Sequence, residues 1–254
     1  MHLGKWLLPA APVVALLALW EALAHARVLD PLFFPPPSIL ATTAVEMIRD
    51  GSLALHLAAT LRRLLAGFLI GSMAGLSCGL LMGASTRLRQ MFEPLFSALY
   101  STPKLTLLPM LMLFFGVGEA SRVFLIAVSC FVLIAVHALD AVRSVDAAHV
   151  EVARNYGARR WDVLRKVYVP ASLPMIFTGL RLALGRGLVI TVSVELLTPS
   201  EGLGSMIWLA WQSFATERLY IGVILTAVLG GMFHAGLRQL ERRAIPWRNS
   251  GGEA

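Results

Sequence analysis

The sequence predicts an all-α protein that crosses a membrane repeatedly as one helical bundle of about six spans. Of its 254 residues, 57% are hydrophobic and only 15% are charged, whereas a soluble domain carries roughly 25% charged residues. Several apolar stretches approach the about 20 residues that a helix needs to cross the hydrocarbon core. The formal net charge of +7 is typical of a chain with Lys and Arg in its cytoplasmic loops. We therefore expect membrane lipid, and no nucleic acid, around this protein.

Six apolar stretches account for the predicted spans. They are residues 7–23, 64–84, 94–117, 123–139, 175–197 and 219–237. The first could be a signal peptide, but bulky residues follow it in place of a small-residue cleavage site, so we expect an uncleaved span. The third is interrupted by Pro103, Lys104 and Pro109.

The distribution of basic residues predicts the orientation. Lys and Arg outside the spans fall mainly in the N-terminal segment, in the loops around residues 85–92 and 143–168, and after the last span. Because such residues concentrate in cytoplasmic loops, we expect both termini to lie inside. Arg62 and Arg63, just before the second span, run against this pattern.

The segment between the first two spans predicts a short amphipathic helix on the outer membrane surface. Apolar residues recur there at helical spacing from Ile39 to Ile48. Ser38 is the expected N-cap and Gly51 the expected stop.

The second span carries a glycine at every fourth residue: Gly67, Gly71, Gly75, Gly79 and Gly83. Glycines at this spacing let a second helix backbone approach closely. The packing partner is either another helix of the same chain or a second copy of the chain, and the sequence leaves both open.

Motifs that indicate an enzyme are missing or misplaced. The stretch GLSCG at residues 75–79 matches the G-x-S-x-G pattern, but Ser77 falls within an apolar helix, where no strand-to-helix turn forms. No lysine fits the phosphate-binding loop pattern, and Cys78 and Cys130 lack the spacing of a metal site. We therefore expect no catalytic residue, no metal and no cofactor in this chain.

Arg186 and Glu195 lie within the apolar run of the fifth span. Ionisable groups in hydrocarbon are costly, so they usually face a cavity or a polar partner. The two are too far apart along one helix to pair directly. Both are therefore candidates to line a pathway or a polar interface.

The segment at about residues 144–172 is charged and prone to form helices, although it lies between two spans. Asp146 is a suitable N-cap for a first short helix, and Gly157 predicts a bend into a second one over residues 160–168. Pro170 and a further proline are expected to end that second helix. The segment is either a compact cytoplasmic knob or a solvated amphipathic loop on the lipid surface.

This segment resembles the EAA loop of ABC-importer permeases, whose pattern is E-A-A, three residues, G, nine residues and then I-x-L-P. The chain reads Glu151-Val152-Ala153, Gly157 and Val167-Tyr168-Val169-Pro170, with every spacing preserved. The departures are a valine at the first alanine and valines at the two aliphatic positions. Stretches such as IFTGLRLALGRGLVITVSVELL also look like the nitrate, sulfonate and taurine importer group, and the similarity runs from about Phe34 to Trp247.

The resemblance implies a type I ABC-importer permease fold in a single domain, residues 1–254, with a core at 56–245 and a coupling loop at about 144–172. It implies a homodimer in the bacterial plasma (inner) membrane, two ATP-binding subunits and a periplasmic solute-binding protein. ATP would then be bound by the partner subunit. The residues expected to couple to the ATPase are Glu151, Ala153, Gly157, Val167 and Pro170. A nitrate-, sulfonate- or taurine-like anion or a thiamine-precursor pyrimidine is a compatible solute.

Two other function classes remain to be weighed. A secondary transporter driven by an ion gradient often shows internal repeats and broken helices, and no repeat is visible here. An intramembrane enzyme needs a nucleophile and base or a metal constellation, which the motifs do not supply. Neighbouring genes for an ATPase and a secreted binding protein would separate these classes.

Overall fold

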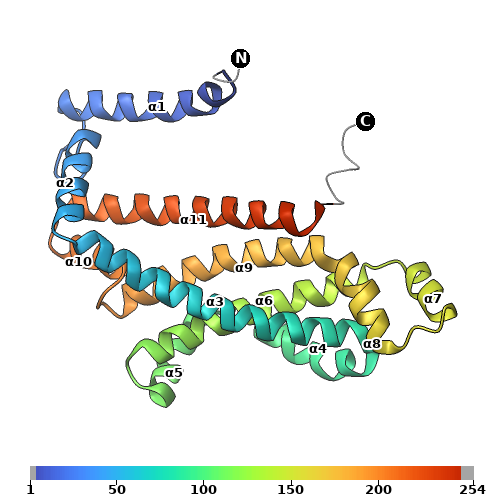
Figure 1. Ribbon diagram of the computed structural model, residues 1–254. Helices are drawn as coiled ribbons and strands as arrows, with labels where there is room; N and C mark the ends of the chain where they lie inside the picture. The colour runs from blue at the N-terminus through green and yellow to red at the C-terminus, as the bar shows by residue number, and fades with distance from the viewer. Residues whose placement is uncertain (1–3, 247–254) are drawn as a thin grey trace. The chain divides into compact units, whose positions relative to one another are not determined.

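The computed structural model describes residues 4–246, with side chains described from residue 11 onward. Every element of secondary structure in that part of the chain is a helix (Figure 1). In chain order they are α1 (Gly4–His25), α2 (Pro37–Arg49), α3 (Ser52–Ala84), α4 (Thr86–Ser101), η1 (Lys104–Leu107), α5 (Leu108–Phe115), α6 (Glu119–Arg143), α7 (Ala147–Asn155), α8 (Arg160–Val163), η2 (Leu164–Tyr168), α9 (Val169–Leu197), α10 (Leu203–Gln212) and α11 (Thr216–Ala244).

Contacts group the chain into two compact units, which are described separately. Unit 1 holds the residues up to Thr60 and Glu195–Ala227. Unit 2 holds Leu61–Val194 and the residues from Val228 onward.

Four described helices are long and apolar enough to cross a membrane. They are Ser52–Ala84, Glu119–Arg143, Arg160–Leu197 and Thr216–Ala244. A fifth span is possible where α4 meets η1 and α5, but this pair is bent by 96°. The described residues thus give four or five spans, against the six expected from the sequence.

The difference from six concerns the third and the first expected spans. The third expected span is broken before Pro103, because a residue that precedes a proline is disfavoured in the α region, and Thr102 is extended, with ψ of 129°. The first expected span, residues 7–23, falls within α1, of which the structure describes side chains only from Ala11 onward.

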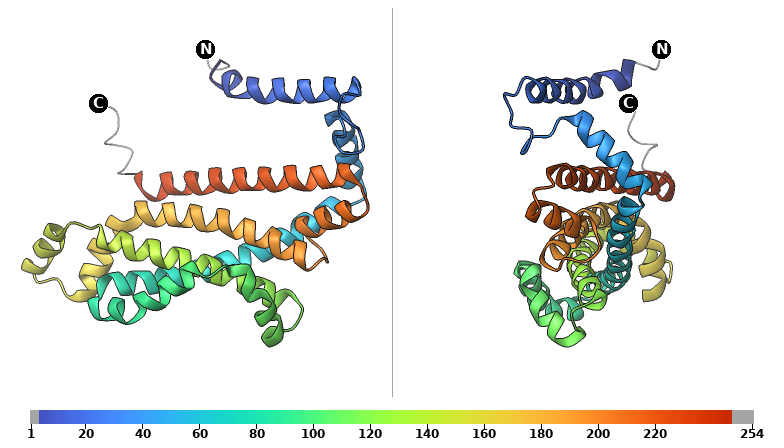
Figure 2. Two further views of the ribbon diagram at one scale, coloured as in Figure 1. Left: turned by 180° about the vertical axis from the view of Figure 1, so that it is seen from behind. Right: turned by 90° about the vertical axis from the view of Figure 1, so that its left-hand side faces the viewer.

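In unit 2, α3 packs on α6 along the glycine ridge. A Cβ added at Gly71, Gly75 or Gly79 would lie 2.3, 2.5 and 2.3 Å, respectively, from a backbone carbonyl oxygen of α6. At Gly67 and Gly83 it would meet side chains of α6 at 2.6 and 2.5 Å. The partner helix of the ridge therefore belongs to the same chain. Figure 2 shows the unit 2 parts of α3, α6 and α9 running side by side.

The second helix of the charged loop continues into α9, so the stop expected at Pro170 is wrong. The run Arg160–Leu197 forms one long helix, with Pro174 inside α9. Proline lacks the N–H that the preceding turn would bond. The π-helical turn η2, directly before α9, changes the hydrogen-bond register there. The prolines therefore distort the helix without ending it.

In unit 1, Ser38 does not cap α2 as expected. Pro36 occupies the N-cap position. The hydroxyl and the backbone N–H of Ser38 instead donate to the carboxylate of Glu21 on α1, at 2.7 and 3.0 Å. Ser38 therefore ties α2 to α1.

The turn between α2 and α3 follows the expected pattern. Gly51 takes a positive φ of +79° directly after α2. Asp50 accepts hydrogen bonds from the backbone N–H and the hydroxyl of Ser52, at 2.8 and 2.7 Å. These bonds favour the charged carboxylate and hold the pKa of Asp50 below its usual value.

Candidate functional site

The loop between α6 and α9 is a two-helix element of unit 2. The carboxylate of Asp146 accepts a hydrogen bond from the backbone N–H of Ala148 at 2.9 Å and caps α7. Gly157 lies in the turn after α7 with φ of +81°, and a Cβ there would meet nothing within 4 Å. Val150 and Val163 are buried, so each helix turns an apolar side chain inward. The loop is therefore a folded two-helix element that bends at Gly157.

The outer side chains of this loop are open to a partner. Tyr156 and Trp161 are 89% and 68% exposed, and Figure 1 shows α7 and α8 at one end of unit 2. Sequence reasoning did not single out these two residues as site residues. The signal that could have found them is a pair of large aromatic side chains beside the bend of a charged loop.

The residues that match the EAA pattern divide into two groups. Glu151 and Gly157 are exposed, whereas Ala153, Val167 and Pro170 are half-buried. The first group can contact another protein directly. The second group lies where it helps to hold the loop's shape.

Glu195 is fully buried in unit 1 and is held by hydrogen bonds. The hydroxyl of Thr60 lies 3.0 and 2.9 Å from its two carboxylate oxygens. The backbone N–H of Gly204 donates to the carboxylate at 3.0 Å, and that of Leu203 donates to the Thr60 hydroxyl at 2.8 Å. The carboxylate thus binds the N-terminus of α10, where N–H groups without a helical partner favour a negative charge.

Gly202 makes room for this carboxylate. Its φ is +126°, and an added Cβ would lie 2.3 Å from the carboxyl carbon of Glu195. The helix α10 was not expected from the sequence. Glu195 was a candidate to line a pathway or to form a polar interface. The geometry supports a polar interface, formed between helices of the same chain.

Arg186 lines a cavity of about 310 Å³ in unit 2, together with Lys104. The walls come from residues 100–104 at the break after α4, from α6 and from α9. Sequence reasoning noted Lys104 only as an interruption of the third span. The cavity brings together two basic residues from distant parts of the chain.

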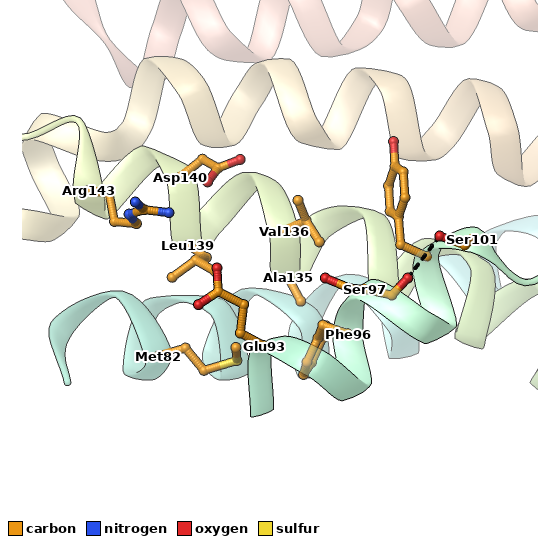
Figure 3. A pocket seen from close by; sticks show the side chains of 11 residues that line it. Met82, Glu93, Phe96, Ser97, Ser101, Ala135, Val136, Leu139, Asp140 and Arg143 are labelled. Atoms are coloured by element: carbon orange, nitrogen blue, oxygen red, sulfur yellow. Dashed lines mark hydrogen bonds between the residues drawn. The ribbon is translucent and has the colours of Figure 1, made fainter. Parts of the chain in front are cut away.

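A second cavity, of about 230 Å³, adjoins the first, because Tyr100 and Ser101 line both. The hydroxyl of Ser101 donates to the carbonyl of Ser97 at 3.0 Å. Figure 3 shows the cavity between α4 and α6. Its charged residues are Glu93, Asp140 and Arg143. The two cavities therefore meet at the end of α4, where they share Tyr100 and Ser101.

Several other arginines of unit 2 have acidic partners. Arg63 is buried and donates to Glu119 through Nε at 2.8 Å and Nη2 at 2.6 Å. Arg122 adds a contact to the same carboxylate at 3.3 Å. Arg181 on α9 pairs with Glu241 at 2.7 Å. Arg63 does not follow the concentration of basic residues in cytoplasmic loops. Its guanidinium instead binds the carboxylate of Glu119, which joins α3 to α6.

Ser77, which matches the serine of the G-x-S-x-G pattern, occupies an ordinary position within α3. The hydroxyl of Ser77 donates to the carbonyl of Met73 at 2.8 Å, within α3. This is an ordinary helical position without the turn of a nucleophile elbow. Within the described residues, no group of three or more His, Cys, Asp or Glu side chains is placed to hold a metal ion.

Comparison with known families gives one match that covers most of the chain. Residues 67–246 match the model of the family described as "Binding-protein-dependent transport system inner membrane component".

Curated relatives are similar over nearly the whole length. The chain is 34% identical to the taurine transport system permease protein TauC of Escherichia coli, over 92% of this chain and 87% of that protein. It is 35% identical to the putative aliphatic sulfonates transport permease protein SsuC of Bacillus subtilis, over 96% of this chain and 87% of that protein. It is 30% identical to the nitrate import permease protein NrtB of Leptolyngbya laminosa, over 78% and 71%.

Solved structures share the fold at low sequence identity. An inward-facing structure of the MetNI methionine ABC transporter matches with a TM-score of 0.67 at 18% identity, over 73% of this chain and 93% of that chain. A crystal structure of an amino acid ABC transporter with histidines matches with a TM-score of 0.62 at 19% identity, over 79% and 97%.

Proposed function

The chain belongs to the family of binding-protein-dependent transport system inner membrane components, and from this premise we propose that it couples a separate ATPase to the movement of a small anion. It is the membrane-spanning permease subunit of an ABC importer. Family membership favours this function over a secondary transporter driven by an ion gradient.

The coupling proposal rests on the two-helix loop, α7 and α8. It combines the EAA spacing with two exposed aromatic side chains, Tyr156 and Trp161. Large aromatic residues that enter a partner's pocket often carry much of the binding energy of an interface. We infer that the ATPase receives this loop, with Glu151 and Gly157 in the contact.

The inferred partners complete a transporter. Two ATP-binding subunits hold the nucleotide, so this chain needs no cofactor of its own. A second copy of the permease forms the other half of the membrane part, and a periplasmic binding protein delivers the solute. The coupling loop and both termini are then cytoplasmic, in agreement with the concentration of Lys and Arg in those segments.

A small oxyanion is the proposed solute. The relatives named above carry the names of taurine, aliphatic sulfonates and nitrate. Sulfonates and nitrate share a compact, negatively charged group of oxygens. The basic residues of the cavity beside α4 are chemically suited to such a group.

The coupling proposal is tested by Gly157→Asp, which adds a charged side chain at the bend of the loop. The matched control is Gly51→Asp, because Gly51 has nearly the same φ, +79°, and equally open space around it. Both variants therefore carry a similar backbone strain, of about 1–3 kcal/mol. Only Gly157→Asp should reduce co-purification of the ATPase with detergent-solubilised permease, and with it solute uptake in cells.

Both variants should insert into the membrane normally, which would show that any loss of ATPase binding does not come from misfolding. If Gly157→Asp binds the ATPase and supports uptake as well as Gly51→Asp does, the loop is not the coupling element.

A further inference from the structure

The break between α4 and η1 places two basic side chains on one cavity within the helices of unit 2. Lys104 lies at the start of η1, and Arg186 lies on α9. Both line the cavity of about 310 Å³, a size at the lower end of the about 300–1,000 Å³ typical of small-molecule sites. No lining residue of this cavity is acidic. Its charge therefore favours an anion.

Lys104 is fixed in place by the end of α4. Its ammonium group donates to the carbonyls of Thr102 at 2.7 Å and Tyr100 at 3.2 Å, and also to that of Leu99. A lysine ammonium group has three N–H donors and no acceptor. The three carbonyls therefore occupy all of its donors. The carbonyls satisfy the donors but carry no formal negative charge. Lys104 therefore supplies a stationary positive charge to the cavity.

Arg186 differs from the paired arginines of unit 2. Arg63 and Arg181 each bind a carboxylate, whereas the described residues offer Arg186 no hydrogen bond or ion pair. Its side chain is exposed in the single chain. A guanidinium has five donors in a planar fork that matches the oxygens of an oxyanion. Arg186 can therefore bind an anion without giving up an existing partner.

The serine and threonine hydroxyl groups around the cavity are already engaged. Ser101, Thr102 and Ser129 each donate to a backbone carbonyl of their own helix, at 3.0, 2.8 and 2.9 Å. Their remaining capacity is that of acceptors, which do not attract an anion. Recognition of an oxyanion therefore depends chiefly on the two basic residues, and the hydroxyl of Tyr100, which also lines the cavity, is a further donor.

We propose that Arg186 and Lys104 form the anion subsite of the translocation pathway, with Arg186 as the hydrogen-bonding ligand and Lys104 as the fixed charge. This inference rests on the proposed function and specifies its substrate class as a small monovalent oxyanion, such as a sulfonate or nitrate. The adjoining cavity, which shares Tyr100 and Ser101 and contains Arg143 (Figure 3), continues the path. Its carboxylates, Glu93 and Asp140, limit how strongly an anion is held after it leaves the subsite.

The test uses the permease with its ATPase and binding protein in liposomes, and labelled taurine, ethanesulfonate and nitrate as probes. Arg186→Gln removes the charge and the fork, Arg186→Lys keeps only the charge, and Lys104→Gln removes the fixed charge. The matched control is Arg238→Gln, since Arg238 is exposed on α11 and lines neither cavity.

Arg186→Gln should slow uptake of the best-transported probe by about 10-fold to 100-fold, as expected from the loss of a charge-assisted hydrogen bond. Arg186→Lys should fall between Arg186→Gln and the wild type, and Lys104→Gln should also be slower than the wild type. Arg238→Gln should match the wild type. The ATPase should co-purify with all four variants as it does with the wild type.

The possible failures are distinguishable. Wild-type uptake by Arg186→Gln would overturn the subsite and leave the permease function intact. Loss of ATPase binding together with uptake in Arg186→Gln would give Arg186 a structural role and also overturn the subsite. A wild-type complex that takes up none of the three probes, while it still binds the ATPase, would overturn both the anionic substrate class and the subsite.

Discussion

Glu195 and Arg186 lie on the same helix, α9, yet their surroundings differ. Glu195 is fully buried and bonded to Thr60 and to the start of α10. Arg186 is exposed in the single chain and lines a cavity. A buried carboxylate is tolerated only where hydrogen bonds replace water. The sequence placed both residues in one class of candidates, and burial separates them.

Glu195 is expected to stabilise the turn between α9 and α10. Glu195→Leu leaves the Thr60 hydroxyl and the Gly204 N–H without this acceptor, at a cost of about 1–3 kcal/mol for each buried group left unsatisfied. Glu195→Gln keeps an oxygen acceptor and should lose less stability. Thermal unfolding of the purified variants in detergent measures the difference. Equal melting temperatures for Glu195→Leu and the wild type would show that the carboxylate does not hold α10.

Arg63 and Arg62 provide a matched pair of neighbouring arginines. The Arg63 side chain is 2% exposed and lies 2.6 Å from Glu119, whereas that of Arg62 is 66% exposed and lies 3.9 Å from it. The Glu119 side chain is 46% exposed, so the half-buried pair with Arg63 should contribute less than the about 3–5 kcal/mol of a fully buried pair, but more than the about 0–1 kcal/mol of an exposed pair. Arg63→Gln should therefore lower thermal stability in detergent clearly more than Arg62→Gln. Similar melting temperatures would contradict a packing role for Arg63.

At the scale of helices, the glycine ridge determines how closely α3 and α6 approach. Backbone carbonyls of α6 lie where the Cβ atoms of Gly71, Gly75 and Gly79 would stand. Close backbone approach of this kind is a principal source of helix association in membranes, where lipid is as apolar as the side chains. The ridge is thus used within the chain.

Gly79→Ala should weaken the packing of α3 on α6. The new Cβ would lie 2.3 Å from the carbonyl oxygen of Ala135, so the two helices must move apart. Gly236→Ala is the control, because Gly236 lies in α11 and an added Cβ meets nothing within 4 Å. In a helix, alanine is favoured over glycine by about 1 kcal/mol. We expect lower thermal stability and yield for Gly79→Ala only, and unaltered behaviour of both variants would mean that the helices are not in this contact.

At the scale of the whole molecule, the orientation in the membrane links the coupling loop to its partner. The loop is proposed to be cytoplasmic, and the turn after α2 is proposed to lie outside. Arg159→Cys and Arg49→Cys, in a background with Cys78 and Cys130 replaced, place one exposed thiol in each segment. An impermeant maleimide should label Arg49→Cys in intact cells and Arg159→Cys only after the membrane is opened. Labelling of Arg159→Cys in intact cells would reverse the orientation.

Much of the fold could be predicted from the sequence because its signals are local. Apolar runs identified the positions of α3, α6, α9 and α11, and Asp146 and Gly157 identified the start and the bend of the charged loop. The errors are local as well. Pro170 does not end its helix. The π-helical turn that precedes α9 changes the hydrogen-bond register at the point where the proline N–H is missing. Ser38 caps nothing, because Glu21 binds it instead.

Composition and short-range spacing by themselves determined that this protein is a helical membrane protein, and that its loop carries the spacing of an importer permease. Only the tertiary structure decided which helix the glycine ridge contacts, that Glu195 meets Thr60 from α3, and that Lys104 and Arg186 share a cavity. The physical reason is that helical periodicity shows which face of a helix is apolar or polar and says nothing of the helix that face will meet. Those partners are set by the close packing of whole helices, through contacts between residues far apart in the chain.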